Sequence, residues 1–260
     1  MRALVEQAKG RPGYEDSMLA AAAHTEAFHG RFAKARELDR QSWQAAEKAD
    51  GKDRVPLYIV SAAWRDGEAG NTEIARQQVA VALKASNARL VREPAAMALA
   101  AAGDTAGAGR LADELAQQYP LDSRIQNYIV PTVRAQILRR QGRPAAAVEE
   151  LQKALNMELS TGDTTQMEAN YVRGLAYLQL RNPSAAVAEF QKIIDHPALV
   201  GNFVTGALAH LQLARAEALS GKTEAARTEY QNFLALWRDA DPGSPILKQA
   251  KAEYAKLVQI

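Results

Sequence analysis

The glycine-rich stretch "AGDTAGAGRLADEL" at residues 102–115 is the first candidate for chemistry, because closely spaced glycines can cradle a phosphate. A phosphate-binding loop follows a strand, opens a helix and usually ends in lysine and a hydroxyl residue. Here residues 94–102 have an alanine-rich pattern typical of a helix, and the Gly-Lys-Ser/Thr ending is missing. The stretch is therefore interpreted as a turn between two helices.

Histidine and carboxylate residues also fail to form a pattern that indicates catalysis or metal binding. His24 and His29 are five residues apart on an expected helix, whereas a spacing of four places two zinc ligands on one face. His196 and His210 are interpreted as structural, and the adjacent carboxylates at residues 149–150 diverge on a helix. We predict that the chain is not an enzyme and uses neither metal nor cofactor.

The composition favours a helical protein. Of 260 residues, 47% are hydrophobic, enough to bury a core, but only 6% are aromatic, and alanine is abundant. The net charge of +2 comes from interspersed charges, so no nucleic-acid partner is expected, and cysteine is absent. No apolar run of membrane-spanning length occurs, so we expect no membrane insertion. The default expectation is a cytoplasmic location, or an extracytoplasmic one if a membrane helix precedes this region in a parent protein.

The chain contains a sixfold internal repeat. Six segments share an alanine at their sixth place, and five of them begin with glycine, which suits the positive φ that closes a helix. Twelve residues before each alanine lies another small residue, so each unit predicts two helices in close antiparallel contact. The six pairs of small residues are Ala23 and Ala35, Ala63 and Ala75, Ala96 and Ala108, Ala135 and Ala147, Gly174 and Ala186, and Ala214 and Ala226.

These repeats predict one all-α domain over residues 1–260. It comprises a remnant helix of an earlier repeat at 1–14, the repeats at 15–240 and a capping helix at 244–260. Pro131 lies in an unusually long first helix and should kink it. Helix pairs are expected at 15–49, 53–85, 89–118, 121–158, 164–195 and 203–238, with a terminal helix at 245–259.

The repeated pattern resembles the tetratricopeptide repeat (TPR). The segments "GLAYLQLRNPSAAVAEFQKII" at 174–194 and "LARAEALSGKTEAARTEYQNFL" at 213–234 carry the resemblance. In the first unit, Asp39 and Ser42 occupy positions where the family prefers bulky groups. The resemblance implies a right-handed α-solenoid of about six helix hairpins whose first helices line a concave face.

Residues 128–154, 189–237 and 238–257 resemble the C-terminal TPR region of acidobacterial serine/threonine protein kinases and related winged-helix regulators. The resemblance implies a sensing or partner-recruiting region of a parent protein with an amino-terminal effector domain. Kinase activity does not carry over, because the chain has no His-Arg-Asp motif, no Asp-Phe-Gly motif and no nucleotide loop on a strand.

We predict a noncatalytic module that binds a protein or peptide segment in its concave groove. Arginine, methionine and aromatic residues are enriched at binding hot spots. The alternative is a small-ligand sensor that controls an attached effector domain, and the oligomeric state stays open. The candidate groove residues are Trp64, Met97, Gln136, Arg139, Tyr171, Leu175, Leu178 and Arg215.

Overall fold

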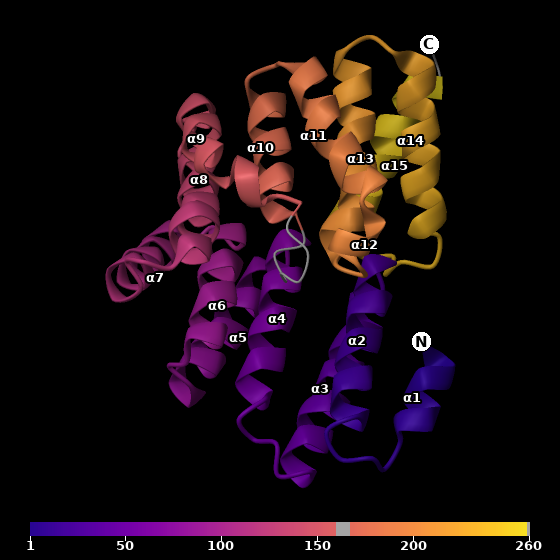
Figure 1. The fold of residues 1–260 in the computed structure, drawn as a ribbon. Helices are drawn as coiled ribbons and strands as arrows, with labels where there is room; N and C mark the ends of the chain where they lie inside the picture. Colours follow the sequence, from indigo (N-terminus) through magenta and orange to yellow (C-terminus); the bar gives the residue numbers. More distant parts are fainter. Residues whose placement is uncertain (160–166, 259–260) are drawn as a thin grey trace.

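The structure is a computed structural model that describes residues 1–159 and 167–258. These residues form fifteen α-helices, one π-helical turn and one 3-10 helix, and they contain no strand. The helices pack as consecutive antiparallel hairpins, so the chain is an all-α, TPR-like solenoid (Figure 1). Within the same residues, every helix is too short or too polar to cross a bilayer.

Six hairpins occupy the positions that the repeat predicts. The predicted start of the fifth pair at 164–166 and the end of the terminal helix at 259–260 lie outside the described residues. The hairpins are α2 (Glu15–Phe28) with α3 (Phe32–Lys48), α4 (Val55–Glu68) with α5 (Thr72–Ala85), α6 (Arg89–Ala101) with α7 (Thr105–Gln118), α8 (Val130–Arg140) with α9 (Pro144–Glu150), α10 (Glu168–Gln179) with α11 (Pro183–Asp195), and α13 (Val204–Leu219) with α14 (Thr223–Leu236).

Three further helices complete the chain. Helix α1 (Arg2–Ala8) packs on α2, and α12 (Pro197–Val200) is a single turn between the fifth and sixth hairpins. Helix α15 (Pro245–Val258) packs on α14, at the position where a seventh hairpin would begin. It therefore caps the last hairpin.

The repeated small residues lie in the buried interior of the hairpins. All eleven alanines of the six pairs are fully buried, and Gly174 is buried as well. At Gly174 the approach is so close that a Cβ would lie 2.6 Å from Cε1 of Phe190. A larger side chain at any of these positions would force two helix backbones apart.

The first residue of each hairpin turn has a left-handed backbone. At Gly103 φ is +79°, and Asp104 begins α7 by accepting a hydrogen bond of 2.9 Å from the Gly107 amide. The glycine-rich stretch is thus a helix–helix turn, as predicted. Arg181 occupies the same place in the fifth hairpin with φ of +53°, although it is not glycine.

We expect Arg181→Gly to stabilise the protein by about 1 kcal/mol, because a side chain in the left-handed region costs about that much. The Arg181 side chain is exposed, so the substitution removes little packing. The measurement is the free energy of unfolding from urea denaturation. Arg181→Ala keeps the strained backbone and should give no such gain; an equal gain from both variants would contradict this explanation.

The fourth hairpin departs from regular α-helix in both of its arms. A π-helical turn, η1 (Ile125–Ile129), precedes α8, and Pro131 lies in the first turn of α8. Proline has no N–H to donate and clashes with the carbonyl four residues earlier, so the wider π turn accommodates it. The sequence predicts a kink at Pro131, and the structure has a π-helical turn immediately before this helix. The second arm continues from α9 as a 3-10 helix, η2 (Leu151–Met157).

The first hairpin replaces the bulky residues of the repeat pattern with buried polar contacts. Asp39 accepts a hydrogen bond of 2.6 Å from the guanidinium of Arg65 on α4, and both side chains are buried. Ser42 donates to the carbonyl oxygen of Asp16 over 2.8 Å. These positions still join neighbouring helices, but through hydrogen bonds instead of apolar packing.

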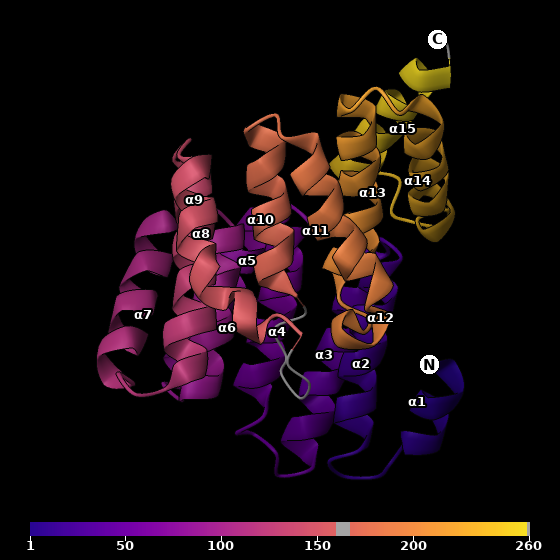
Figure 2. The same ribbon diagram turned by 45° about the horizontal axis from the view of Figure 1, so that its top comes forward.

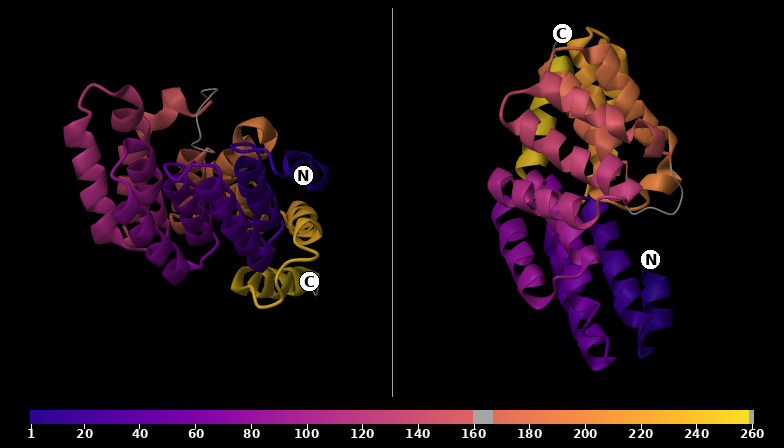
Figure 3. Two further views of the ribbon diagram at one scale, coloured as in Figure 1. Left: turned by 90° about the horizontal axis from the view of Figure 1, so that it is seen from below. Right: turned by 60° about the vertical axis from the view of Figure 1, so that its left-hand side comes forward.

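The stack curves until its last hairpin contacts its first. The hairpins from α2 to α6 form the lower part of Figure 1 and those from α8 to α14 the upper part, and Figure 3 shows the two parts against each other from two other sides. Figure 2 shows α12 and the beginning of α13 close to α2. Helix α13 packs against both α2 and α4, which are more than 130 residues earlier in the chain.

Specific contacts close this ring at the turn between α2 and α3. The indole of Trp237, which is fully buried, donates to the carbonyl of Phe28 over 3.0 Å and packs edge-on against Phe32. The amide of Asp241 donates to the carbonyl of Gly30 over 3.0 Å, and its carboxylate accepts from the Ala33 amide over 2.9 Å. We call this set of contacts between residues 28–33 and 236–241 the clasp.

Nearer the middle of α2, Asn202 donates hydrogen bonds of 2.8 and 2.9 Å to the Ala21 carbonyl and the Thr25 hydroxyl. His29 donates from Nδ1 to the carbonyl of Leu236 over 3.0 Å. The clasp therefore uses backbone groups that would otherwise be exposed at the ends of α2 and α14.

A comparison of two turn glycines tests the clasp. A Cβ at Gly30 would lie 2.7 Å from Cδ2 of Trp237, whereas a Cβ at Gly221 would meet nothing within 4 Å, and both have φ near +75°. Gly221→Ala should cost about 1 kcal/mol, the price of the left-handed backbone alone. Gly30→Ala should cost clearly more, measured by denaturation. Equal costs would mean that the first and last hairpins are not in contact.

Candidate functional site

The eight groove residues predicted from sequence lie on α4, α6, α8, α10 and α13, which are the first helices of five hairpins. Trp64, Met97, Gln136 and Tyr171 are buried, with exposed fractions of 3–6%. The remaining four are half-buried: Arg139, Leu175, Leu178 and Arg215. The first helices form the inner wall of the curved stack.

Trp64 and Met97 lie together in a small pocket on this wall. The pocket has a volume of about 70 Å³, and Leu90, which is 65% exposed, lies at it. Pro94 and Ile129 complete the apolar lining, which comes from α4, α6 and η1. Apolar residues from three successive first helices thus converge, although they are far apart in sequence.

One polar pair flanks the pocket. Glu93 forms ion pairs with Arg124, another lining residue, and with Arg89 on its own helix. Glu93 is 2% exposed, so the arginines neutralise a carboxylate that would be costly to bury alone. The pocket therefore combines an apolar floor with one compensated charge pair.

An aromatic side chain from a distant part of the sequence covers Trp64. Phe203, just before α13, packs on the indole with ring centroids 4.8 Å apart, and His24 packs on the other side of Phe203 at 5.8 Å. His24 bonds the Ser61 hydroxyl over 3.0 Å, and burial followed by the charge of Arg65 lowers its pKa to about 3. This histidine is neutral and structural.

A pair of carboxyl groups lies deeper in the ring, where α4 meets α10. Burial, followed by the proximity of Glu68, raises the pKa of Glu168 well above its ordinary value. Burial also raises the pKa of Glu68, against the opposing influence of Glu168 and Arg139. The pair therefore holds one proton more readily than either group would alone.

Polar groups from the next helices surround this pair. Arg139 donates to the Gln136 side chain over 2.9 Å, and burial lowers the pKa of Arg139. Burial, then Glu68, raises the pKa of Tyr171, whose hydroxyl is hydrogen-bonded to Gln212. Three predicted groove residues, Gln136, Arg139 and Tyr171, thus belong to one interior polar cluster.

The other predicted residues have packing or pairing partners. Leu175 and Leu178 pack against the apolar core. Arg215 donates to both carboxylate oxygens of Glu253 on the capping helix, over 2.9 and 3.2 Å. Glu253 also accepts from the Tyr230 hydroxyl over 3.0 Å, so Arg215 helps to hold α15 in place.

Replacing Glu168 tests the effect of its raised pKa on stability. A carboxyl whose folded pKa is raised destabilises the protein increasingly as pH rises from its unfolded value through its folded value. Glu168→Gln removes that effect and lets an amide donate to Glu68. We expect it to raise the free energy of unfolding by about 1 kcal/mol at pH 7.5, since Glu168 Oε2 is buried without a donor.

The gain should vanish at pH 4, where the wild-type carboxyl is largely protonated in both states. The matched control is Glu189→Gln, which weakens the bidentate pair with Arg173, with contacts of 2.8 and 2.6 Å, and should destabilise the protein. A loss of stability from Glu168→Gln at pH 7.5 would contradict a raised pKa of Glu168 in the folded protein.

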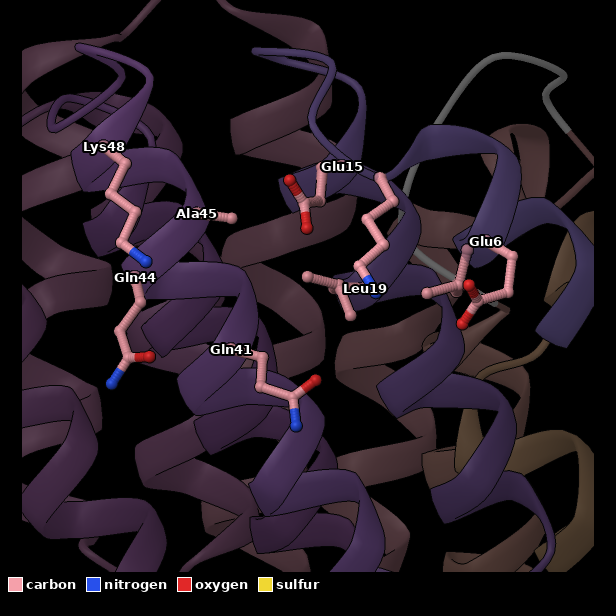
Figure 4. Close-up of a pocket in the computed structure, with 9 residues that line it drawn as sticks. Glu6, Glu15, Leu19, Gln41, Gln44, Ala45 and Lys48 are labelled. Atoms are coloured by element: carbon pink, nitrogen blue, oxygen red, sulfur yellow. The ribbon is translucent and has the colours of Figure 1, made fainter.

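Other surface features are less suited to a specific ligand. The pocket of about 280 Å³ between α1, α2 and α3 is lined mainly by side chains of both charges and amides, including Glu6, Glu15, Gln41 and Lys48 (Figure 4). His210 pairs with Glu229 over 2.7 Å, and His196 bonds its own helix. Over residues 1–159 and 167–258, no three acidic, histidine or cysteine side chains gather in a metal-binding arrangement.

Comparisons with known proteins support the repeat assignment locally. The family profile described as tetratricopeptide repeat matches residues 168–195, which are α10 and α11. No curated protein matches the chain. The resemblance noted for residues 174–194 thus falls within a recognised TPR.

Sequence reasoning missed Leu90, Glu68, Glu168 and Phe203. Leu90 lies at the start of α6, two turns before Met97, and a longer count along the helix would have found it. Glu68 and Glu168 lie at opposite ends of their helices, so no repeat position relates them. Phe203 reaches Trp64 only through ring closure.

Proposed function

We propose that this chain is a noncatalytic module that binds a polypeptide segment on its inner face, at the pocket formed by Trp64, Leu90, Pro94, Met97 and Ile129. The observation that carries the proposal is an exposed leucine beside a buried tryptophan and methionine. Solenoids of TPR type typically serve protein–protein interaction, and aromatic and methionine side chains in a pocket suit an apolar anchor.

The size and chemistry of the pocket define the segment. About 70 Å³ suits one apolar side chain better than a metabolite, so it favours a peptide over the small-ligand alternative. Arg124, which is partly exposed beside the apolar floor, offers a donor to a peptide backbone. The half-buried groove residues Arg139, Leu175, Leu178 and Arg215 would extend the contact along the wall.

We further propose that the module is the C-terminal sensing or partner-recruiting region of a bacterial serine/threonine kinase or regulator. The resemblance of residues 128–154 and 189–257 to such regions supports this context. In such a parent protein, the module positions a partner for the effector domain and does not itself catalyse a reaction.

A peptide selection tests the binding site. A displayed library of 12-residue peptides is selected on the purified protein, and the affinities of the selected peptides are measured by fluorescence anisotropy. We expect peptides with a shared apolar residue, and we expect Leu90→Asp to weaken them at least about tenfold, because it places a carboxylate at an apolar pocket.

The matched control is Leu121→Asp, at a leucine that is 97% exposed and does not line the pocket. It should leave the affinity unchanged. Failure to select any peptide, or equal losses from the two variants, would refute binding at this pocket.

A further inference from the structure

The turn that joins α12 to α13 places an aromatic side chain between the first two hairpins. This part of the chain lies close to α2 in Figure 2. The ring of Phe203 is 4.8 Å from the indole of Trp64 on α4 and 5.8 Å from the imidazole of His24 on α2, between centroids. Phe203 is only 3% exposed, so rings from two hairpins enclose a side chain of the sixth.

The residue before this phenylalanine adds a polar contact to α2. The side-chain amide of Asn202 donates to the carbonyl oxygen of Ala21 over 2.8 Å and to the hydroxyl oxygen of Thr25 over 2.9 Å. One amide and one ring on successive residues thus contact the same two helices. We call Asn202 and Phe203 the insert. The residues that receive it form the insert site, which consists of Ala21, His24, Thr25 and Trp64.

The backbone of the turn makes its hydrogen bonds within the turn itself. The amide of Gly201 donates to the carbonyl of Pro197 over 2.8 Å, and the amide of Phe203 donates to the carbonyl of Val200 over 3.3 Å. Gly201 is exposed, and a Cβ added there would meet nothing within 4 Å. Rotation of the two inserted side chains away from the insert site would therefore break none of these backbone hydrogen bonds.

The groups that contact the insert are uncharged. They are a carbonyl oxygen, a hydroxyl and two rings, and His24 stays neutral because burial, followed by the charge of Arg65, lowers its pKa to about 3. A charged side chain buried at the insert site would gain no opposite charge from these groups. A side-chain amide can donate to the two oxygens, and an aromatic ring can pack between the two rings. The insert site is therefore selective for a neutral amide followed by an aromatic residue.

We propose that the insert site binds a partner segment that carries asparagine followed by an aromatic residue, and that Asn202 and Phe203 occupy this site until the partner displaces them. A segment of the same chain meets its site at an effective concentration of the order of millimolar. The insert therefore lowers the apparent affinity for the partner by the fraction of molecules in which the site is vacant. This proposal goes beyond the inner-face pocket, with which the insert site shares only Trp64, because it adds α2, a second kind of occupant and a means of regulation.

The test uses a fluorescein-labelled peptide with the sequence of residues 196–205, HPALVGNFVT. Fluorescence anisotropy should show saturable binding to the full chain that carries Phe203→Ala, because that substitution vacates the space between the two rings. We expect this binding to be at least about tenfold tighter than binding to the wild type. The same peptide with alanine in place of its phenylalanine should bind neither protein.

A second variant vacates the site without removing a ring. Asn202→Asp cannot donate to the Ala21 carbonyl, so it should also bind the peptide more tightly than the wild type does, by about fivefold. The matched control is Leu199→Ala, at a half-buried residue of α12 that leaves both inserted side chains in place, and it should bind as weakly as the wild type. Thr25→Val, added to Phe203→Ala, removes one acceptor and should weaken the peptide about fivefold.

Circular dichroism compares the helicity of each variant with that of the wild type. Absence of peptide binding by Phe203→Ala and Asn202→Asp, or equal binding of the two peptides, would overturn the proposal. Loss of helicity in both variants would overturn it too, because the insert would then be required for the fold and could not be displaced. If this peptide fails while library-selected peptides respond to Leu90→Asp, the insert site is refuted and the inner-face pocket stands; the reverse pattern refutes the pocket alone.

Discussion

The close contact of two helices at a pair of small residues is the constraint on which the whole structure depends. Each hairpin carries two of these small residues, one on each helix, and all of them are buried. This contact brings the backbones together and leaves the larger residues to pack between hairpins. Because the contact recurs six times, the hairpins stack in one direction and the stack curves.

The curvature of the stack brings its first and last hairpins into contact. The sixth hairpin reaches the first, and Trp237 and Asp241 bond to the turn between α2 and α3. Six hairpins thereby form a ring with contacts between its ends, where a longer open solenoid would leave both ends free. Closure buries Trp64 beneath Phe203 and divides the inner face into a small apolar pocket and an interior polar cluster.

Several buried acids pair with arginines, either on a neighbouring hairpin or on their own. Asp39 binds Arg65, Glu158 and Glu189 bind Arg173, and Glu93 binds two arginines. Such pairs contribute less net stability than apolar packing does, but they favour one register of the stack over others. Glu68 and Glu168 are different because two acids lie close together, and burial raises the pKa of both.

The amino-acid sequence alone determined the helices, their pairing and their turns, because these depend on local spacing. Alanine at a fixed place, glycine at a left-handed turn and proline in the fourth hairpin each act within about 15 residues, so the pattern predicts them directly. Tertiary structure decided the clasp, the covering of Trp64 by Phe203 and the meeting of Glu68 with Glu168. These contacts depend on the small angles between neighbouring hairpins, added up over all six hairpins. No single repeat encodes that sum, which brings residues 28–33 against residues 236–241. For the same reason the sequence identified Trp64 as a candidate groove residue but could not show that Phe203, from a distant part of the chain, covers it.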